Sequence, residues 1–203
     1  MSHHVLVLGG HGKVAQLLTP LLLQRSWTVT SVIRAQEQVP TIEKLGAGQP
    51  GKLNVLTFKI DRDAAVHFIN AAAATPSVTR FLLVSYIGSR RAGASWWPEG
   101  EWEQYNESVN HGVLANYYKA KIVADEELYR ASRRNPHLVG INLRPGLLTD
   151  DPVGKVADTL LAAEGIKNTW LDLYDGDEEI EDAVKRVVQA GINVAEGEPV
   201  YSE

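Results

Sequence analysis

The stretch Val5–Ala15, VLVLGGHGKVA, places four apolar residues before a glycine-rich turn and a helix-forming segment. Gly10-x-Gly12-x-x-Ala15 fits the G-x-G-x-x-G/A pattern of dinucleotide-binding turns. A variant spacing begins one residue earlier, at Gly9. Glycines let the backbone approach a pyrophosphate, and the following helix points unpaired N–H groups and its positive dipole end at that anion. The stretch therefore predicts a dinucleotide-binding turn rather than a glycine turn without a ligand.

Segments of strand length alternate with helical patterns along the rest of the chain, as expected for a parallel sheet covered by helices on both faces. The predicted strands are Val5–Leu8, Thr28–Ile33, Val55–Ile60, Arg80–Ser85, Leu138–Leu143 and Thr169–Tyr174. The predicted helices are Lys13–Arg25, Gln38–Leu45, Ala64–Ala74, His111–Arg134, Val156–Ala163 and Glu178–Ala190. No internal repeat or low-complexity linker interrupts this alternation. We therefore expect one α/β domain over residues 1–203.

Composition and charge narrow the class of protein. The 203 residues, 44% hydrophobic and 22% charged, suit a soluble globular domain with a sizeable core. A net charge of -5 without a basic stripe argues against nucleic acid as a partner. Cysteine is absent, which excludes disulfides and thiolate catalysis. No signal-peptide pattern or bilayer-spanning apolar run is found, so we expect a cytoplasmic protein without a membrane partner. No metal site is predicted, because His3 and His4 lack ligand spacing to other donors.

Tyr117 and Lys121 lie four residues apart in a long predicted helix, so their side chains project from one face. A phenol with an ordinary pKa of ~10 is a poor proton shuttle at neutral pH, and a nearby ammonium favours its ionised form. Ser85 ends a predicted strand and would orient a substrate carbonyl through its hydroxyl. The same spacing also describes a half-buried ring beside a lysine that extends to solvent, and Tyr118 is a second candidate. We predict Ser85, Tyr117 and Lys121 as the catalytic group.

Three further positions border the predicted nucleotide site. Arg34 closes the second strand, where the adenosine ribose is expected. An arginine there suits the 2′-phosphate of NADP, whereas an acidic residue suits NAD. The alternative is a solvated loop arginine. Pro145 and Gly146 end another strand at the same sheet edge, where their turn would let the backbone approach the nicotinamide end.

The segment Gly88–Glu107 is long, irregular and rich in tryptophan. It follows a predicted strand, and ligands of open α/β sheets bind beyond the carboxyl ends of the strands. It is therefore either a substrate lid or a set of rings that pack on the domain's own surface or at a dimer contact. The sequence leaves both interpretations open.

Four stretches of the chain resemble the atypical short-chain dehydrogenase/reductases, in particular the NmrA-like, NAD(P)-binding single-domain proteins of fungal type. They are VLVLGGHGKVAQLLTPLLLQRSWTVTSVIR (5–34), DRDAAVHFINAAAATPSVTRFLLVSYIGSRR (61–91), YYKAKIVAD (117–125) and LRPGLLTDD (143–151). With the tryptophan-rich segment and the C-terminal helix, the resemblance covers most of the chain. The glycine motif, the serine-ended strand and Tyr-x-x-x-Lys are specific in combination.

The resemblance implies a Rossmann-like, doubly wound parallel sheet, NADP as cofactor with NAD as the alternative, and a small carbonyl-type substrate. It also implies catalytic roles for Ser85, Tyr117 and Lys121. Some members of the group sense NADP redox state without turnover, so a non-catalytic NADP(H)-responsive, partner-binding protein is the alternative. A homodimer is the candidate assembly. With the turn and strand-end residues included, the predicted cofactor-binding set is Gly9, Gly10, His11, Gly12, Lys13, Val14, Arg34, Pro145 and Gly146.

The chain departs from the group at two places. Relatives carry a further helix and a strand with an Ala-Gly turn, where this chain passes directly from Leu56 to Asp61. They also carry a short Arg-Glu-Asp-containing turn where Gly154–Asp158 joins the two sides directly. Both places are interpreted as internal deletions. With the first strand missing, either Arg80–Ser85 moves beside Val5–Leu8 to give a six-stranded order, or an apolar face stays exposed.

Overall fold

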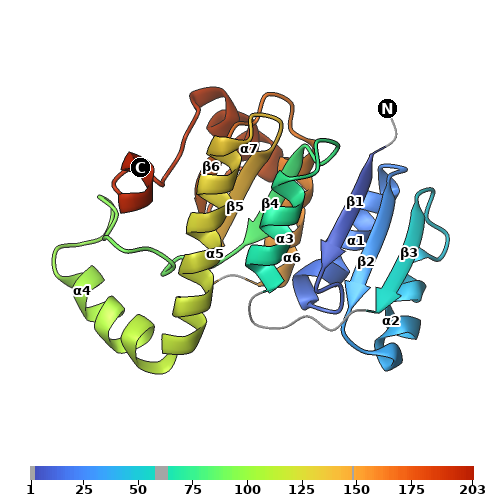
Figure 1. Ribbon diagram of the computed structural model, residues 1–203, viewed down its shortest axis with the longest axis horizontal. Coiled ribbons are helices and arrows are strands. Elements are labelled where there is room, and N and C mark those ends of the chain that lie inside the picture. The colour runs from blue at the N-terminus through green and yellow to red at the C-terminus, as the bar shows by residue number, and fades with distance from the viewer. Residues whose placement is uncertain (1–2, 58–63, 148) are drawn as a thin grey trace. The chain divides into compact units, whose positions relative to one another are not determined.

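A computed structural model of the chain describes residues 3–57, 64–147 and 149–203. They divide into two compact units, which we describe separately (Figure 1). Unit 1 takes in residues 3–57 and 149–162, and unit 2 takes in residues 64–147 and 163–203. Every strand pair in both units is parallel, and helices flank the sheets. This confirms the predicted Rossmann-like α/β class, whereas a single domain over 1–203 stays a prediction.

Unit 1 is built on a three-stranded sheet in the order β1-β2-β3. The central strand is buried from Val29 to Ile33, as its apolar sequence predicts. The strands are β1 (His4–Leu8), β2 (Thr28–Ile33) and β3 (Lys52–Thr57). The helical segments are α1 (Lys13–Gln24), η1 (Gln36–Gln38), α2 (Val39–Glu43), η2 (Lys44–Gly46) and α6 (Asp150–Ala162).

Helix α6 packs against α1, although the two are far apart in the sequence. Arg25 and Asp158, 133 positions apart, form a two-pronged ion pair with both N···O distances at 2.8 Å. A Cβ at Gly154 would lie 3.3 Å from the Cβ of Leu17, so the absence of a side chain allows the close approach. The prediction of a helix at Val156–Ala163 therefore placed its start six residues too late. Gly154 lies inside the helix, where it allows α6 to approach α1 closely and does not end the helix.

Unit 2 is built on a second three-stranded sheet, in the order β4-β5-β6. Its strands are β4 (Arg80–Val84), β5 (Val139–Pro145) and β6 (Thr169–Leu173). The helices are α3 (Ala64–Ala73), α4 (Glu101–Tyr105), α5 (Ala115–Arg134) and α7 (Ile180–Ala190). A π-helical segment, η3 (Asn106–Val113), precedes α5, and a 3-10 turn, η4 (Pro199–Ser202), lies near the C-terminus.

Helices cover both faces of the unit 2 sheet. Helices α3 and α5 lie side by side over one face (Figure 1). Their shared core consists of Ile69, Ala73, Ala124, Leu128, Ala131 and Leu138, with Phe81 and Leu83 of β4 packed against it. Successive strand residues point to opposite faces. Trp170 of β6 contacts Tyr129 of α5, whereas its neighbour Leu171 lines a cavity with Val187 of α7, so α7 covers the other face.

Besides α6, two predicted elements differ from the structure by three or more residues at one end or both. Strand β3 spans Lys52–Thr57 and not Val55–Ile60, with a register that pairs Thr28 with Lys52 and Ile33 with Thr57. Polar residues such as Asn54 interrupt the apolar pattern in the first half of the strand, so the sequence does not indicate where it begins. Residues 58–60 lie outside the described part of the chain. The helix expected at His111–Arg134 starts at Ala115, because Gly112 has non-helical backbone angles.

Arg80–Ser85 and Val5–Leu8 belong to different units, so the expected six-stranded order with these two strands side by side stays a prediction. The alternative expectation, an apolar face left exposed, likewise stays a prediction. The deletions themselves stay predictions: residues 58–61 are not described, and Gly154–Asp158 lies inside α6. None of the helices described is both long enough and apolar enough to cross a bilayer.

The core under α5 yields a test of the fold. Leu128 is 1% exposed and packs against α3, β4 and the start of β5. We expect Leu128→Ala to lower the free energy of unfolding by about 2–5 kcal/mol, because a cavity remains. Val123 on the same helix is 51% exposed, and we expect Val123→Ala to change it by less than about 1 kcal/mol. Urea denaturation followed by circular dichroism measures both, and equal losses would contradict the packing.

Candidate functional site

The glycine turn of unit 1 has the local geometry that the sequence predicts. Gly9 adopts a positive φ of 71°, which favours glycine. The N–H of Gly10 donates to the carbonyl of Val32 at 2.8 Å, which ties the turn to the end of β2. A Cβ at Gly10 would lie 1.8 Å from the Oγ of Ser31, so this position excludes any side chain. The turn closes with the N–H of Gly12 donating to the carbonyl of Gly9 at 2.8 Å.

The start of α1 is suited to an anion. Among the described residues no side chain caps this helix, and its first turn contains no acidic residue. The N–H of Gln16 donates to the carbonyl of Gly12 at 2.9 Å, which leaves the three preceding N–H groups of the helix without an intrahelical partner. His11 and Lys13 are exposed and Val14 is half-buried. Unpaired N–H groups at a helix N-terminus bind phosphates readily.

A second polar group lies beneath the same turn. The Ser31 hydroxyl is fully buried and has no hydrogen-bond partner among the described residues. It faces the position that a Gly10 Cβ would occupy. Arg34 directly follows β2 and is exposed, and its N–H donates to the Gln38 side chain at 3.2 Å. The described residues offer its guanidinium no ion-pair partner, so it is available to a bound anion.

In unit 2 the structure brings Tyr117 and Lys121 together on α5. The Lys121 ammonium lies 5.5 Å from the centre of the Tyr117 ring. It donates to the carbonyl of Val84 at 2.7 Å, and Val84 is the residue directly before Ser85. Tyr117 is 45% exposed, and its ring lies 5.1 Å from that of Tyr86. The arrangement joins the tyrosine, the lysine and the carboxyl end of β4 at one place.

The protonation behaviour of this pair differs from the sequence-based expectation. Burial, and next the charge of Asp125, raise the pKa of Tyr117. Burial lowers the pKa of Lys121, although Asp125 acts in the opposite direction. The pKa of Tyr117 therefore moves away from neutrality and not toward it, because burial and the charge of the buried carboxylate both raise it. At neutral pH Tyr117 keeps its proton, which suits a proton donor.

Tyr118, the second candidate, occupies a structural position. It is 8% exposed, and its hydroxyl donates to the carbonyl of Arg90 at 3.2 Å. Its ring packs edge-on against His111. The structure thus separates the two neighbouring tyrosines, because only Tyr117 presents its ring to the Lys121 ammonium.

Ser85 lies at the expected strand end, but its hydroxyl is engaged. It is 4% exposed, and its Oγ donates to Oδ2 of Asp125 at 2.8 Å. Ser89 donates to the same oxygen at 2.5 Å. Sequence reasoning missed Asp125. The signal that would have found it is the spacing of Tyr117, Lys121 and Asp125, which repeats at i, i+4 and i+8 along one face of α5.

Asp125 carries a strongly perturbed carboxyl group. It is fully buried, and burial raises its pKa from the ordinary 3.8 to about 6. Hydrogen bonds from Ser89 and Ser85 and the charge of Arg144 act against this shift. A perturbed buried carboxyl next to candidate catalytic groups is typical of functional sites.

Pro145 and Gly146 end β5 at the same edge of the unit 2 sheet. The carbonyl of Pro145 accepts a hydrogen bond from the N–H of Ile87 at 2.9 Å. The N–H of Gly146 donates to the carbonyl of Leu173 at 2.9 Å. A Cβ at Gly146 would lie 3.4 Å from the ring of Tyr174, so a glycine suits this close packing. Both residues stay predicted contacts of the nicotinamide end.

The tryptophan-rich segment forms an ordered aromatic cluster. Trp97 contacts Trp96, Trp102 and Tyr105 with ring-centre distances of 5.1 to 5.3 Å. Trp102 is 7% exposed, in agreement with rings that pack on the domain's own surface. Trp96 is 43% exposed and meets Tyr174 edge-on at 5.2 Å. The part from Glu101 onward is helical and not irregular, since α4 and η3 occupy it.

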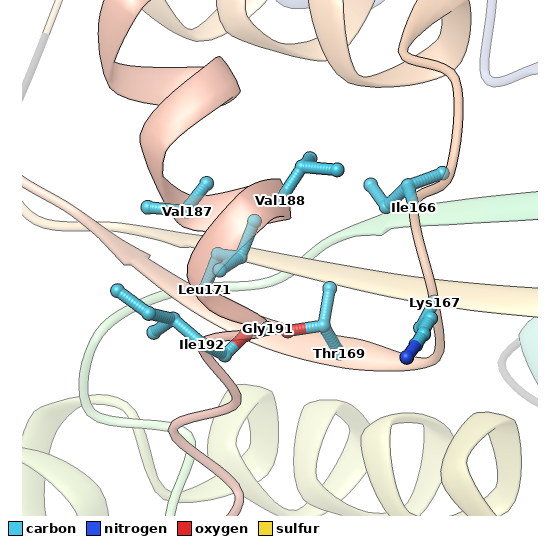
Figure 2. A pocket seen from close by; sticks show the side chains of 8 residues that line it. All are labelled: Ile166, Lys167, Thr169, Leu171, Val187, Val188, Gly191 and Ile192. Atoms are coloured by element: carbon cyan, nitrogen blue, oxygen red, sulfur yellow. Dashed lines mark hydrogen bonds between the residues drawn. The ribbon is translucent and has the colours of Figure 1, made fainter.

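One small cavity lies between β6 and α7, away from these residues (Figure 2). Aliphatic side chains of Ile166, Leu171, Val187, Val188 and Ile192 surround it, with Lys167 at one side. Its volume of about 20 Å³ holds roughly one water molecule. It is therefore a packing gap and not a ligand site.

No protein-family model matches the chain. The uncharacterized sugar epimerase YhfK of Bacillus subtilis (strain 168) is 24% identical over 223 residues, covering 90% of this chain and 99% of that protein. A solved structure from Bacillus halodurans, provisionally named an NAD-dependent epimerase/dehydratase, matches with a TM-score of 0.65 and 21% identity. The match covers 91% of this chain and 100% of that one. Vestitone reductase of alfalfa matches with a TM-score of 0.65 and 16% identity, over 92% of this chain and 81% of the reductase. These similarities support the Rossmann-like fold.

The glycine turn yields a second test. We expect Gly10→Ala to lower the free energy of unfolding by about 1–3 kcal/mol, because its Cβ would overlap Ser31 Oγ. Adding Ser31→Ala should recover part of this loss, since the hydroxyl has no partner to lose. Gly176→Ala is the control, because its Cβ would meet nothing within 4 Å. Urea denaturation measures all four proteins, and a double variant no more stable than Gly10→Ala would contradict this geometry.

Proposed function

We propose that the chain is an NADP(H)-dependent oxidoreductase of the atypical short-chain reductase type, in the NmrA-like branch, acting on a small carbonyl-type substrate. The observation that carries the proposal is the Lys121 ammonium, 5.5 Å from the Tyr117 ring and bonded to the carbonyl before Ser85. The uncapped helix start after the glycine turn supports the cofactor part. Two similar proteins, one provisionally named an NAD-dependent epimerase/dehydratase and the other a reductase, support this class.

The residues of unit 1 fit a dinucleotide. The glycine turn lies close above Ser31, whose buried hydroxyl has no hydrogen-bond partner in the described part of the chain. The N–H groups at the start of α1, which lack an intrahelical partner, suit the pyrophosphate. The binding residues would be Gly9, Gly10, His11, Gly12, Lys13 and Val14. Arg34 would bind the 2′-phosphate that distinguishes NADP from NAD. Pro145 and Gly146 would border the nicotinamide end.

The residues of unit 2 would handle the proton. When bound, the nicotinamide ring supplies a hydride to a carbonyl or takes one from an alcohol. Tyr117 would give its phenolic proton to the substrate oxygen during reduction, and burial keeps that proton in place at neutral pH. Lys121 has three N–H donors and uses one on Val84, so it retains donors for the cofactor ribose. Ser85 would orient the substrate oxygen.

The aromatic cluster favours a second candidate function, a non-catalytic NADP(H)-responsive protein that binds a partner. Trp96 and Tyr174 are 43% and 50% exposed and contact each other. Exposed tryptophan and tyrosine are enriched at protein interfaces. A partner that binds through this pair would be captured differently with and without NADPH, whereas an enzyme would oxidise NADPH with a carbonyl panel.

Cofactor binding is tested by thermal unfolding with NADPH or NADH. A ligand at a hundred times its Kd adds ~2.7 kcal/mol to the folded state. We expect NADPH to raise the melting temperature more than NADH, because Arg34 suits a 2′-phosphate. Arg34→Ala should remove the difference between the two cofactors and keep the NADH shift. Absence of any shift would reject cofactor binding, and equal shifts would reject the role of Arg34.

The catalytic assignment is tested with two neighbouring tyrosines. We expect Tyr117→Phe to lower kcat by about 10²–10⁴, because the proton donor is lost, while the Kd of NADPH changes less than about twofold. Tyr118→Phe is the matched control. It removes a buried hydrogen bond to Arg90 and should cost about 0.5–1.5 kcal/mol of stability, with turnover retained. Steady-state NADPH oxidation and calorimetry measure these effects. Equal losses of turnover in both variants would contradict the roles.

A further inference from the structure

Ser85 faces a limit set by its single proton. A hydroxyl donates one hydrogen bond, and Ser85 gives it to Asp125 Oδ2 at 2.8 Å. The remaining lone pairs of Ser85 can only accept. A substrate carbonyl is also an acceptor, so it finds no donor in Ser85 in this arrangement, whereas a substrate alcohol does find an acceptor. Something must therefore reverse the hydrogen bond before Ser85 can orient a carbonyl.

We propose that Asp125 is a positioning residue that sets the direction of the hydrogen bond at Ser85. As a carboxylate, Asp125 accepts the hydrogen bond from the Ser85 hydroxyl. The Ser85 oxygen can then only accept a hydrogen bond from the substrate, which suits alcohol oxidation. As a carboxylic acid it donates its own proton to Ser85 Oγ, and Ser85 then donates its hydrogen to a substrate carbonyl. The inference rests on the proposed function and assigns Asp125 no contact with substrate.

Burial makes this role available to Asp125. Asp125 and Ser89 are 0% exposed and Ser85 is 4% exposed, so water does not compete for these hydrogen bonds. Both serines bond to Oδ2, and the Asn142 side chain of β5 also interacts with the Asp125 carboxyl group and acts against its raised pKa. The pKa of Asp125, raised by burial to about 6, makes both forms accessible near neutral pH.

The charges around Asp125 come from three parts of unit 2. Lys121 and Tyr117 lie on the same helix. Burial lowers the pKa of Lys121 and the Asp125 charge opposes this shift, whereas burial and then the Asp125 charge both raise the pKa of Tyr117. Tyr86 follows β4 and its pKa is raised by the same charge. Arg144 of β5 lowers the pKa of Asp125 from the opposite side. Loss of the Asp125 charge removes one of the two causes that raise the pKa of Tyr117, so with neutral Asp125 the phenol gives its proton to a substrate oxygen more readily.

The test compares pH profiles of carbonyl reduction and alcohol oxidation in the full chain and in Asp125→Asn. The asparagine is neutral at every pH. Its Nδ2 carries two hydrogens, one for each serine that now meets Oδ2. Glu126→Gln is the matched control, because Glu126 is the next residue, 7% exposed, and pairs with Arg91 away from Ser85.

We expect kcat for reduction in the unmodified chain to fall about tenfold per pH unit above the Asp125 titration, because only the acid form supports it. Alcohol oxidation should rise over the same range. Asp125→Asn should keep reduction within about threefold between pH 5 and pH 8 and lose the rise in oxidation. Glu126→Gln should follow the unmodified chain. Identical profiles for Asp125→Asn and the unmodified chain would overturn the proposal.

A measurement without turnover separates this inference from the proposed function. Because the folded-state pKa of Asp125 lies above its ordinary value, the folded chain binds the proton more tightly than the unfolded chain. The urea midpoint should therefore fall as pH rises from 4 to 6, and Asp125→Asn should remove that fall. Equal falls in both proteins overturn the inference whether or not the chain is active. A fall confined to the unmodified chain, with no carbonyl reduced, refutes the proposed function and leaves the titration of Asp125 established.

Discussion

The buried guanidinium of Arg144 is the constraint on which the arrangement of unit 2 depends. It is 0% exposed, and it donates to Asp172 of β6 at 2.9 Å and to the carbonyl of Ser89 at 3.0 Å. Arg90, also buried, binds the other oxygen of Asp172 at 3.0 Å and Glu198 at 3.3 Å. Two arginines and two carboxylates thereby fix the segment after β4, the ends of β5 and β6, and the C-terminal region.

This network also determines where the candidate site can form. Ser89 is held through its carbonyl by Arg144, and its hydroxyl meets the same Asp125 oxygen as Ser85. Taking buried charges out of water is costly, and removing one partner of such a pair typically costs about 3–5 kcal/mol. The hydroxyl position of Ser85 is consequently set by the charges of Asp125 and Arg144, which are far from it in the sequence, and not by the strand end alone.

The sequence predicted those parts of the structure that depend on local pattern. Strand β1 was found because it contains a continuous apolar run, β2 because it is rich in β-branched residues, and the glycine turn because its spacing is specific. Strand β3 was misplaced because Lys52 and Asn54 give its first half a polar character, while its pairing with β2 determines its bounds. Helix α4 was missed because tryptophans and glycines surround it in the sequence. Its residues Trp102 and Tyr105 are ordered by contacts with the ring of Trp97, which lies outside the helix.

The candidate site was predictable to the same extent. The spacing of Tyr117 and Lys121 correctly placed them on one helical face. The direction of the Tyr117 pKa shift was not predictable, because it depends on burial and on Asp125, whose depth in the fold a sequence does not reveal. The engagement of Ser85 likewise required knowing that α5 brings a carboxylate to the end of β4. Periodicity gives the face of a helix, but not the polarity of what that face meets.

The packing of α6 on α1 has a consequence for how the chain folds as it is made. Arg25 and Asp158 are 133 positions apart, and at a synthesis rate of 5–20 residues per second α6 follows α1 after roughly 7–27 s. During that interval the surface of α1 that receives Gly154 has no native cover. Residues 62–147 of unit 2 are synthesised during this interval. Unit 1 is therefore the first to be started, but it is complete only after most of unit 2 has been made. Nascent chains in which α1 is complete and α6 is not yet made therefore expose part of unit 1, which carries the glycine turn. Chaperones that bind apolar surface would bind to this exposed face of α1.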